Sequence, residues 1–92
     1  MDKIERLIIR AKDLAKLNRY AVDVLFIERV PERRLWRVHG SYLYRGTKKA
    51  AGGFDKMAGT LEAAKDIAAE LAEKYPPLSE SLTVFICDDL EA

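Results

Sequence analysis

Residues 21–44 read AVDVLFIERVPERRLWRVHGSYLY, and this stretch predicts two strands joined by a proline turn. In its first half, apolar side chains occupy both alternating sets of positions: Val22, Val24 and Phe26 on one side, Leu25 and Ile27 on the other. Pro31 presets the backbone for a turn. We therefore expect residues 21–30 to form a central strand that is at least partly covered on both sides.

The second half of the stretch, residues 35–44, alternates more cleanly. One set of positions holds Trp36, Val38, Tyr42 and Tyr44, and the other holds Arg37, His39 and Ser41, with Leu43 as the apolar exception. Such a pattern is typical of an edge strand with one hydrated face, so the aromatic side chains are expected in the core. Gly40 marks a bulge or a close approach of another backbone.

Outside this hairpin the pattern changes to helical spacing. Apolar residues recur at three- and four-residue intervals over 2–18 and again over 60–75, so both segments are expected to be helices. Thr60 is a good N-cap for the second, and Pro76-Pro77 stops it. Residues 82–87 predict a short apolar strand, and residues 46–59, with four glycines, predict a loop.

The expected fold is therefore an α+β protein with the order α-β-β-α-β. It is a two-layer α/β sandwich in which a three-stranded, mainly antiparallel sheet carries two helices on one face. The last strand is expected beside the first, antiparallel to it, because this places the apolar strand 21–30 in the middle. Two helices leave the other face of the sheet uncovered, and a second copy of the chain could bury it.

Size and composition set the broad class. The chain has 92 residues, with 49% hydrophobic and 34% charged residues, which predicts one globular domain over 1–92. No apolar run approaches the roughly 20 residues of a membrane span, and the N-terminus lacks the apolar region of a secretory signal. The single Cys87 fits a reducing compartment, so we expect a cytoplasmic protein without membrane contact.

Charge is distributed unevenly along the chain. Net charge is +1 overall, but residues 28–56 carry eight basic and three acidic side chains, whereas residues 57–92 carry two basic and eight acidic ones. The basic segment supplies our candidate binding surface: Arg33, Arg34, Arg37, Arg45, Lys48 and Lys49. The sequence leaves open whether these six side chains converge into one patch and whether residues 46–59 are ordered.

No pattern for catalysis or for a cofactor is found. His39 and Cys87 are single, and Cys87 lies in an apolar strand, where a structural cysteine is the simpler interpretation. The glycines and lysines of residues 46–53 do not follow the phosphate-binding P-loop pattern, and the acidic residues 88–91 lack calcium-loop spacing. We therefore expect a protein that is not an enzyme and has neither metal nor cofactor.

Binding is the remaining class of function. The first hypothesis is a regulatory or binding module that acts through protein–protein interaction, with an unidentified protein or with itself as a homodimer. The alternative is a nucleic-acid-binding protein that uses the basic hairpin and the Lys/Gly loop. Aromatic residues placed in the core, together with a sequence pI near 7.8, favour the first hypothesis.

Overall fold

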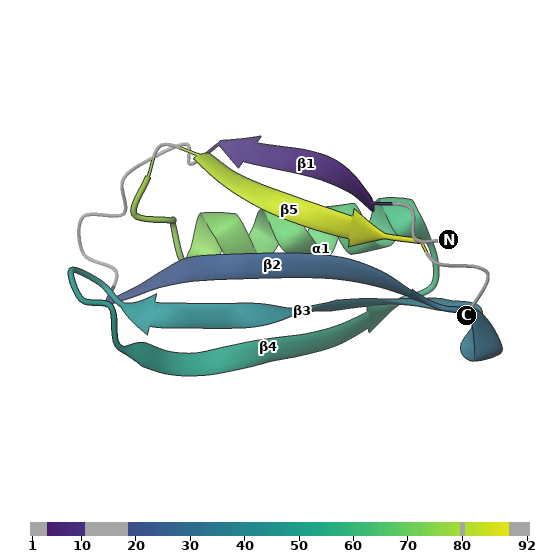
Figure 1. Cartoon of the computed structure of the whole chain (residues 1–92), viewed down its shortest axis with the longest axis horizontal. Helices are drawn as coiled ribbons and strands as arrows, with labels where there is room; N and C mark the ends of the chain where they lie inside the picture. The colour runs from purple at the N-terminus through teal and green to yellow at the C-terminus, as the bar shows by residue number, and fades with distance from the viewer. Residues whose placement is uncertain (1–3, 11–18, 80, 89–92) are drawn as a thin grey trace.

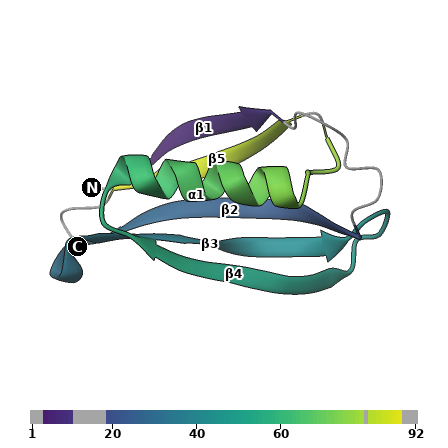
Figure 2. The same ribbon diagram turned by 180° about the vertical axis from the view of Figure 1, so that it is seen from behind.

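The computed structural model describes residues 4–10, 19–79 and 81–88. Its elements in chain order are β1 (Ile4–Arg10), β2 (Tyr20–Val30), the short 3-10 turn η1 (Pro31–Arg33), β3 (Leu35–Tyr44), β4 (Ala50–Ala58), α1 (Leu61–Lys74) and β5 (Ser81–Cys87). All five strands join one sheet in the order β1-β5-β2-β3-β4. The helix α1 runs along one face of this sheet, as the opposite views of Figures 1 and 2 show.

The predicted fold class is wrong. The protein has a five-stranded mixed sheet with one described helix, in place of a three-stranded sheet with two helices. Four of the predicted elements are found within one or two residues at each end: β2, β3, α1 and β5. The error lies in the two segments that become β1 and β4.

The segment predicted as the first helix is β1 over its described part, residues 4–10; residues 11–18 lie outside the described part of the chain. Its apolar positions fit both the helical period of about 3.6 residues and the strand period of two, since Ile4, Leu7 and Ile8 also lie on one side of a helix. As a strand, β1 turns Leu7 and Ile9 toward the core and pairs in antiparallel fashion with β5 over seven residues. Three isoleucines in seven residues favour that outcome, because β-branched side chains pack well on a pleated surface.

The segment predicted as a loop contains β4, which pairs antiparallel to β3. Gly52 lies in register with Tyr42, and a Cβ at position 52 would meet the Tyr42 hydroxyl oxygen at 2.5 Å. The glycine therefore makes room for a tyrosine ring within a strand. Consequently β3 is an interior strand between β2 and β4, and its prediction as an edge strand is also wrong.

The predicted direction of the last strand relative to β2 is also wrong, because β4 was predicted as a loop. The neighbour was predicted correctly, since β5 lies beside β2, but the pair is parallel. Each of the elements β2, β3, β4, α1 and β5 runs in the direction opposite to the one before it. With β3, β4 and α1 between them, β2 and β5 run the same way, whereas with β4 read as a loop they would run in opposite directions. The position of β2 as the middle strand is confirmed.

The core lies between α1 and the sheet. Leu25, Ile27, Val38 and Val84 are fully buried there, opposite the alanine-rich side of the helix. Thr60 caps α1 as predicted, because its hydroxyl oxygen accepts a hydrogen bond from the Ala63 backbone N–H at 3.0 Å. Since side chains alternate along a strand, residues between these core positions face away from α1.

Candidate binding face

The side of the sheet opposite α1 is here called the open face, because no described element lies over it (Figure 1). In β2, Leu25 and Ile27 are buried under the helix, so Val24, Phe26 and Glu28 point to the open face. Phe26 is only partly buried, unlike the core residues on either side of it. An apolar side chain without a covering layer marks a face that remains available for contact.

Strand pairing arranges the open face into rows that cross all five strands. The central row, from β1 to β4, reads Arg6, Phe85, Phe26, His39 and Asp55. The next row reads Ile4, Cys87, Glu28, Arg37 and Met57. On the other side of the central row lie Ile8 with Thr83, and Val24 with Ser41 and Gly53.

Three rings form the middle of the central row. The Phe26 ring centroid lies 5.6 Å from that of Phe85 and 5.5 Å from that of His39, with planes inclined by 26° in both pairs. These contacts join β5, β2 and β3 on the open face. Cross-strand aromatic pairs of this kind stabilise a sheet, and here they also create a continuous apolar strip at its centre.

Large apolar side chains remain exposed at the two margins of this strip. Ile4 and Ile8 of β1 are each 60% exposed, and Met57 of β4 is 46% exposed. Among the described residues, these are three of the five large hydrophobic side chains that are exposed. Their concentration on one side of the sheet distinguishes the open face from the rest of the described surface.

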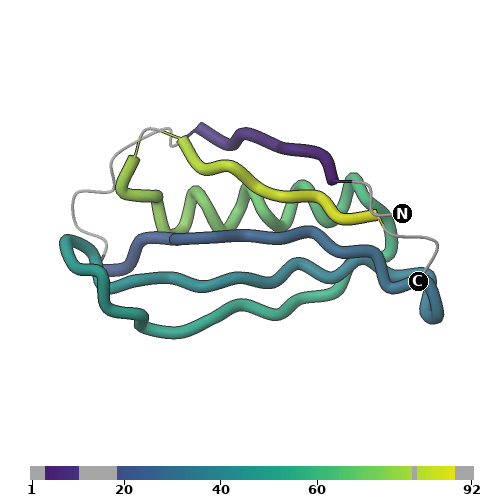
Figure 3. Tube along the Cα trace, in the orientation of Figure 1, coloured from purple at the N-terminus to yellow at the C-terminus, as the bar shows by residue number. Residues whose placement is uncertain are grey.

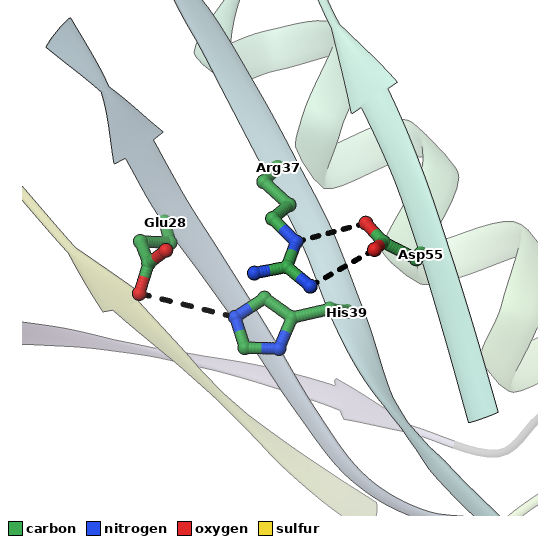
Figure 4. Close-up of polar contacts among 4 residues, drawn as sticks. All are labelled: Glu28, Arg37, His39 and Asp55. Atoms are coloured by element: carbon green, nitrogen blue, oxygen red, sulfur yellow. Dashed lines mark hydrogen bonds and ion pairs between the residues drawn. The ribbon is translucent and has the colours of Figure 1, made fainter.

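Four polar side chains of the open face, drawn in Figure 4, form two contacts across its strands: Glu28, Arg37, His39 and Asp55. Arg37 donates from Nε to Oδ1 of Asp55 at 2.8 Å and from its terminal nitrogen to Oδ2 at 2.9 Å. On the neighbouring strand pair, His39 Nε2 lies 4.0 Å from Glu28 Oε2. That distance is too long for a hydrogen bond, and the buried His39 Nε2 atom has no hydrogen-bond partner among the described residues.

The bidentate pair of Arg37 and Asp55 favours the charged form of both side chains. The hydrogen bond from Arg37 lowers the pKa of Asp55, and the same bond raises the pKa of Arg37. Asp55 nevertheless remains open to further contacts, since its side chain is 57% exposed and a carboxylate accepts about four hydrogen bonds.

A pH series on Asp55→Asn checks this pair. Because the folded pKa of Asp55 is lowered, the pair stabilises the fold above the carboxyl's unfolded pKa, and this contribution is lost as pH falls through the folded pKa. We expect Asp55→Asn to lower the urea midpoint slightly at neutral pH and to match the wild type in strong acid. Asp66→Asn, at an exposed position on α1, is the control. An equal difference between wild type and Asp55→Asn at every pH would contradict the assignment.

The structure does not gather the six predicted basic residues into one surface. Arg33 and Arg34 lie at the turn before β3, whereas Lys48 and Lys49 lie in the turn after it (Figure 3). The ten residues of β3 separate these turns by about 33 Å. Arg37 lies between them on the open face, paired with Asp55.

Arg45, the sixth predicted residue, is used within the fold. Its guanidinium donates to the backbone carbonyl of Tyr20 at 3.2 Å and to that of Pro76. It thereby links the ends of β2 and β3 to the segment that follows α1. The nucleic-acid hypothesis, which uses these basic residues, stays a prediction.

Sequence reasoning missed most of the open face. Arg6 and Ile8 were assigned to a helix and Asp55 to a loop, so their alignment across the sheet was not foreseen. The three isoleucines of residues 4–10 were a signal for a strand, although their spacing also fits a helix. For Asp55 the local sequence, which contains Gly52 and Gly53, carried no comparable strand signal.

The residues considered for chemistry lie apart. His39 is on β3 and Cys87 on β5, and β2 lies between these strands, so their backbones are about 10 Å apart. Within residues 4–10, 19–79 and 81–88, no three His, Cys, Asp or Glu side chains are grouped so that they could hold a metal ion. In the same ranges, no helix has the length and apolar character needed to cross a membrane.

Comparison with protein-family models finds none that matches this chain, and comparisons with curated proteins and with solved structures find no match either. The arguments about function below therefore rest on the geometry of the open face.

Proposed function

We propose that this protein is a non-enzymatic binding module that acts through protein–protein contact at the open face of its sheet. The observation that carries the proposal is the apolar strip of Phe85, Phe26 and His39, bordered by the exposed Ile4, Ile8 and Met57. A central apolar area with charged residues around it is the usual anatomy of a protein interface.

The charged groups on this face also suit a protein partner. Arg6 and Asp55 lie at its two margins, where side chains remain solvated and set orientation more than affinity. Among the described residues, the predicted basic side chains form no comparable patch in support of the nucleic-acid alternative, because they lie at the two ends of β3 and, for Arg37, near its start, where Asp55 pairs with it. The single Cys87 supports a cytoplasmic setting for this function.

Capture from an extract of the source cells tests the proposal. Wild-type bait is compared with Phe26→Lys/Phe85→Lys, which places two charges in the apolar strip, and with Ile8→Asp. Since Ile8 is 60% exposed, the second change leaves the core intact. We expect Phe26→Lys/Phe85→Lys to lose, by at least about tenfold, the proteins that the wild type retains, because charges in the centre of an interface remain unpaired. Ile8→Asp, at the margin, should reduce their capture by a smaller factor.

Glu62→Lys is the control, because that side chain is 84% exposed on α1 and lies on the other side of the molecule. Circular dichroism and urea unfolding establish that each variant folds. If the wild type and both open-face variants retain the same proteins, including the chain itself, the open face is not the binding surface.

A further inference from the structure

The open face has opposite net charge on its two halves. The strand residues that face it from β1 and β5 include Arg6 and Arg10 and no acidic residue among those described. Those from β2, β3 and β4 include Glu28, Asp55 and one arginine, Arg37, together with the exposed Asp23 at the bulge between the core residues Val22 and Leu25. The first half thus carries two positive charges, and the second, from three carboxylates and one guanidinium, a net charge of two negative. A face whose halves differ in sign is complementary to a copy of itself.

We propose that the partner at the open face is a second copy of this chain, packed sheet against sheet about a two-fold axis that runs along β2. This inference rests on the proposed function and names the occupant of that face. Such an axis aligns each row with the same row of the partner and reverses the strand order across the sheet. Consequently β1 of one copy faces β4 of the other, and β2 faces β2.

Row by row, this arrangement matches side chains of suitable chemistry. In the central row, Arg6 faces the partner's Asp55, and the contact occurs twice because the interface is symmetric. Phe26 faces the partner's Phe26 at the axis, between the two charge pairs. Asp55 keeps its bond to Arg37 and still has lone pairs to accept a further donor.

The neighbouring rows match in shape. The exposed Ile4 at one margin faces the partner's Met57, so that two apolar side chains bury each other. On the other side of the central row, Ile8 faces the partner's Gly53, where the absence of a side chain leaves room for the isoleucine. Glu28 lies at the axis and faces the partner's Glu28, and Arg37, its cross-strand neighbour in each copy, offsets part of this repulsion.

Electrostatics disfavour a two-fold axis that runs across the strands along the central row. An axis that runs across the strands would place β1 on β1, with Arg6 facing the partner's Arg6 and Asp55 facing the partner's Asp55. Like charges that face each other across an interface cost several kcal/mol in total, by order of magnitude. The axis along β2 replaces these two repulsions with two attractions, and it leaves one like-charge contact, that of Glu28 with the partner's Glu28.

The area of the open face is sufficient for a dimer. Five strands about 4.8 Å apart and about seven residues long present a face of about 24 by 23 Å. Two such faces bury about 1,100 Å² together, which is above the roughly 1,000 Å² that a specific interface needs.

Sedimentation equilibrium on the purified full chain, from low to high micromolar concentration, tests the inference. We expect the wild type to reach the mass of two chains, and we expect Arg6→Asp and Asp55→Arg each to raise the dimer dissociation constant at least about tenfold. The double change Arg6→Asp/Asp55→Arg restores opposite charges in the exchanged order, so its dissociation constant should return to within about threefold of the wild type. The paired control, Glu62→Lys/Lys65→Glu, exchanges the ion pair between an exposed and a half-exposed side chain of α1 and should leave the constant unchanged.

Two outcomes overturn the inference. One is a monomer mass for the wild type at every concentration; the other is a dimer that the single changes do not weaken or that the double change does not restore. A monomer whose heterologous partners are still lost on Phe26→Lys/Phe85→Lys would overturn the second copy as occupant and leave the proposed function in place. A monomer whose captured proteins do not depend on the open face would overturn both.

Discussion

Gly40→Ala should destabilise the protein by about 3 kcal/mol or more, although it adds a single methyl group. A Cβ at position 40 would lie 1.9 Å from the Val24 carbonyl oxygen and 3.0 Å from the Leu25 Cα. Both contacts are with the backbone of β2, so no flexible side chain can move away to relieve them. The sheet must instead separate locally, which breaks the pairing of its two central strands.

The close approach has a local cause in β2. The register of the β2–β3 pair shifts between Val22 and Val24, which makes Asp23 the extra residue of a bulge. A bulge bends its strand and increases the twist, and here Gly40 on β3 accepts the displaced backbone next to it. The prediction of a close backbone contact at Gly40 is confirmed.

Urea unfolding followed by circular dichroism measures this effect. Gly59→Ala is the matched control, because a Cβ at position 59 meets nothing within 4 Å. We expect the control to unfold within about 0.5 kcal/mol of the wild type. A Gly40→Ala protein with the same midpoint as the control would show that β2 and β3 are not packed in this way.

The second large effect is expected for Arg45→Ala, which should cost about 2 kcal/mol. Truncation removes the guanidinium donor from the carbonyls of Tyr20 and Pro76, and Pro76 is itself fully buried. Hydrogen bonds from a charged donor to buried acceptors are among the stronger ones, and their loss leaves the acceptors without that donor.

Thermal unfolding should detect this as a decrease in melting temperature of about 10 °C. Lys48→Ala, three residues further along in the exposed turn, is the control and should have little effect. If Arg45→Ala were as stable as Lys48→Ala, the guanidinium would not hold the end of the sheet. Arg45 would then again be a candidate for binding a partner.

The residues of the open face could be predicted from the sequence only in part. The prediction that one face of the sheet remains uncovered rests on the small number of expected helices, which can cover one face only. The alternation also placed Phe26 opposite Leu25 and Ile27, as the structure does. The rows could not be foreseen, because they depend on the register of five strands, and two of these strands had been assigned to other structures.

Local signals were sufficient wherever side chains carried strong preferences. The strands β2, β3 and β5 are rich in β-branched and aromatic residues, and α1 begins at a capping threonine and ends before two prolines. In such segments the conformation is favoured by residues within a few positions of one another, so chain order alone is informative.

The structures of β1 and β4 depend on neighbours that are distant in the sequence. Seven residues such as Ile4–Arg10 fit a helical stripe and a strand equally well, and the unpaired edge of β5 supplies the backbone hydrogen bonds that make them a strand. Residues 50–58 have little strand preference of their own, and they become one because β3 offers an edge and the Tyr42 ring covers Gly52. Backbone pairing between distant segments has no signature in local periodicity, and it therefore determined the strand order, the direction of β5 and the alignment of Arg6 with Asp55 across the open face.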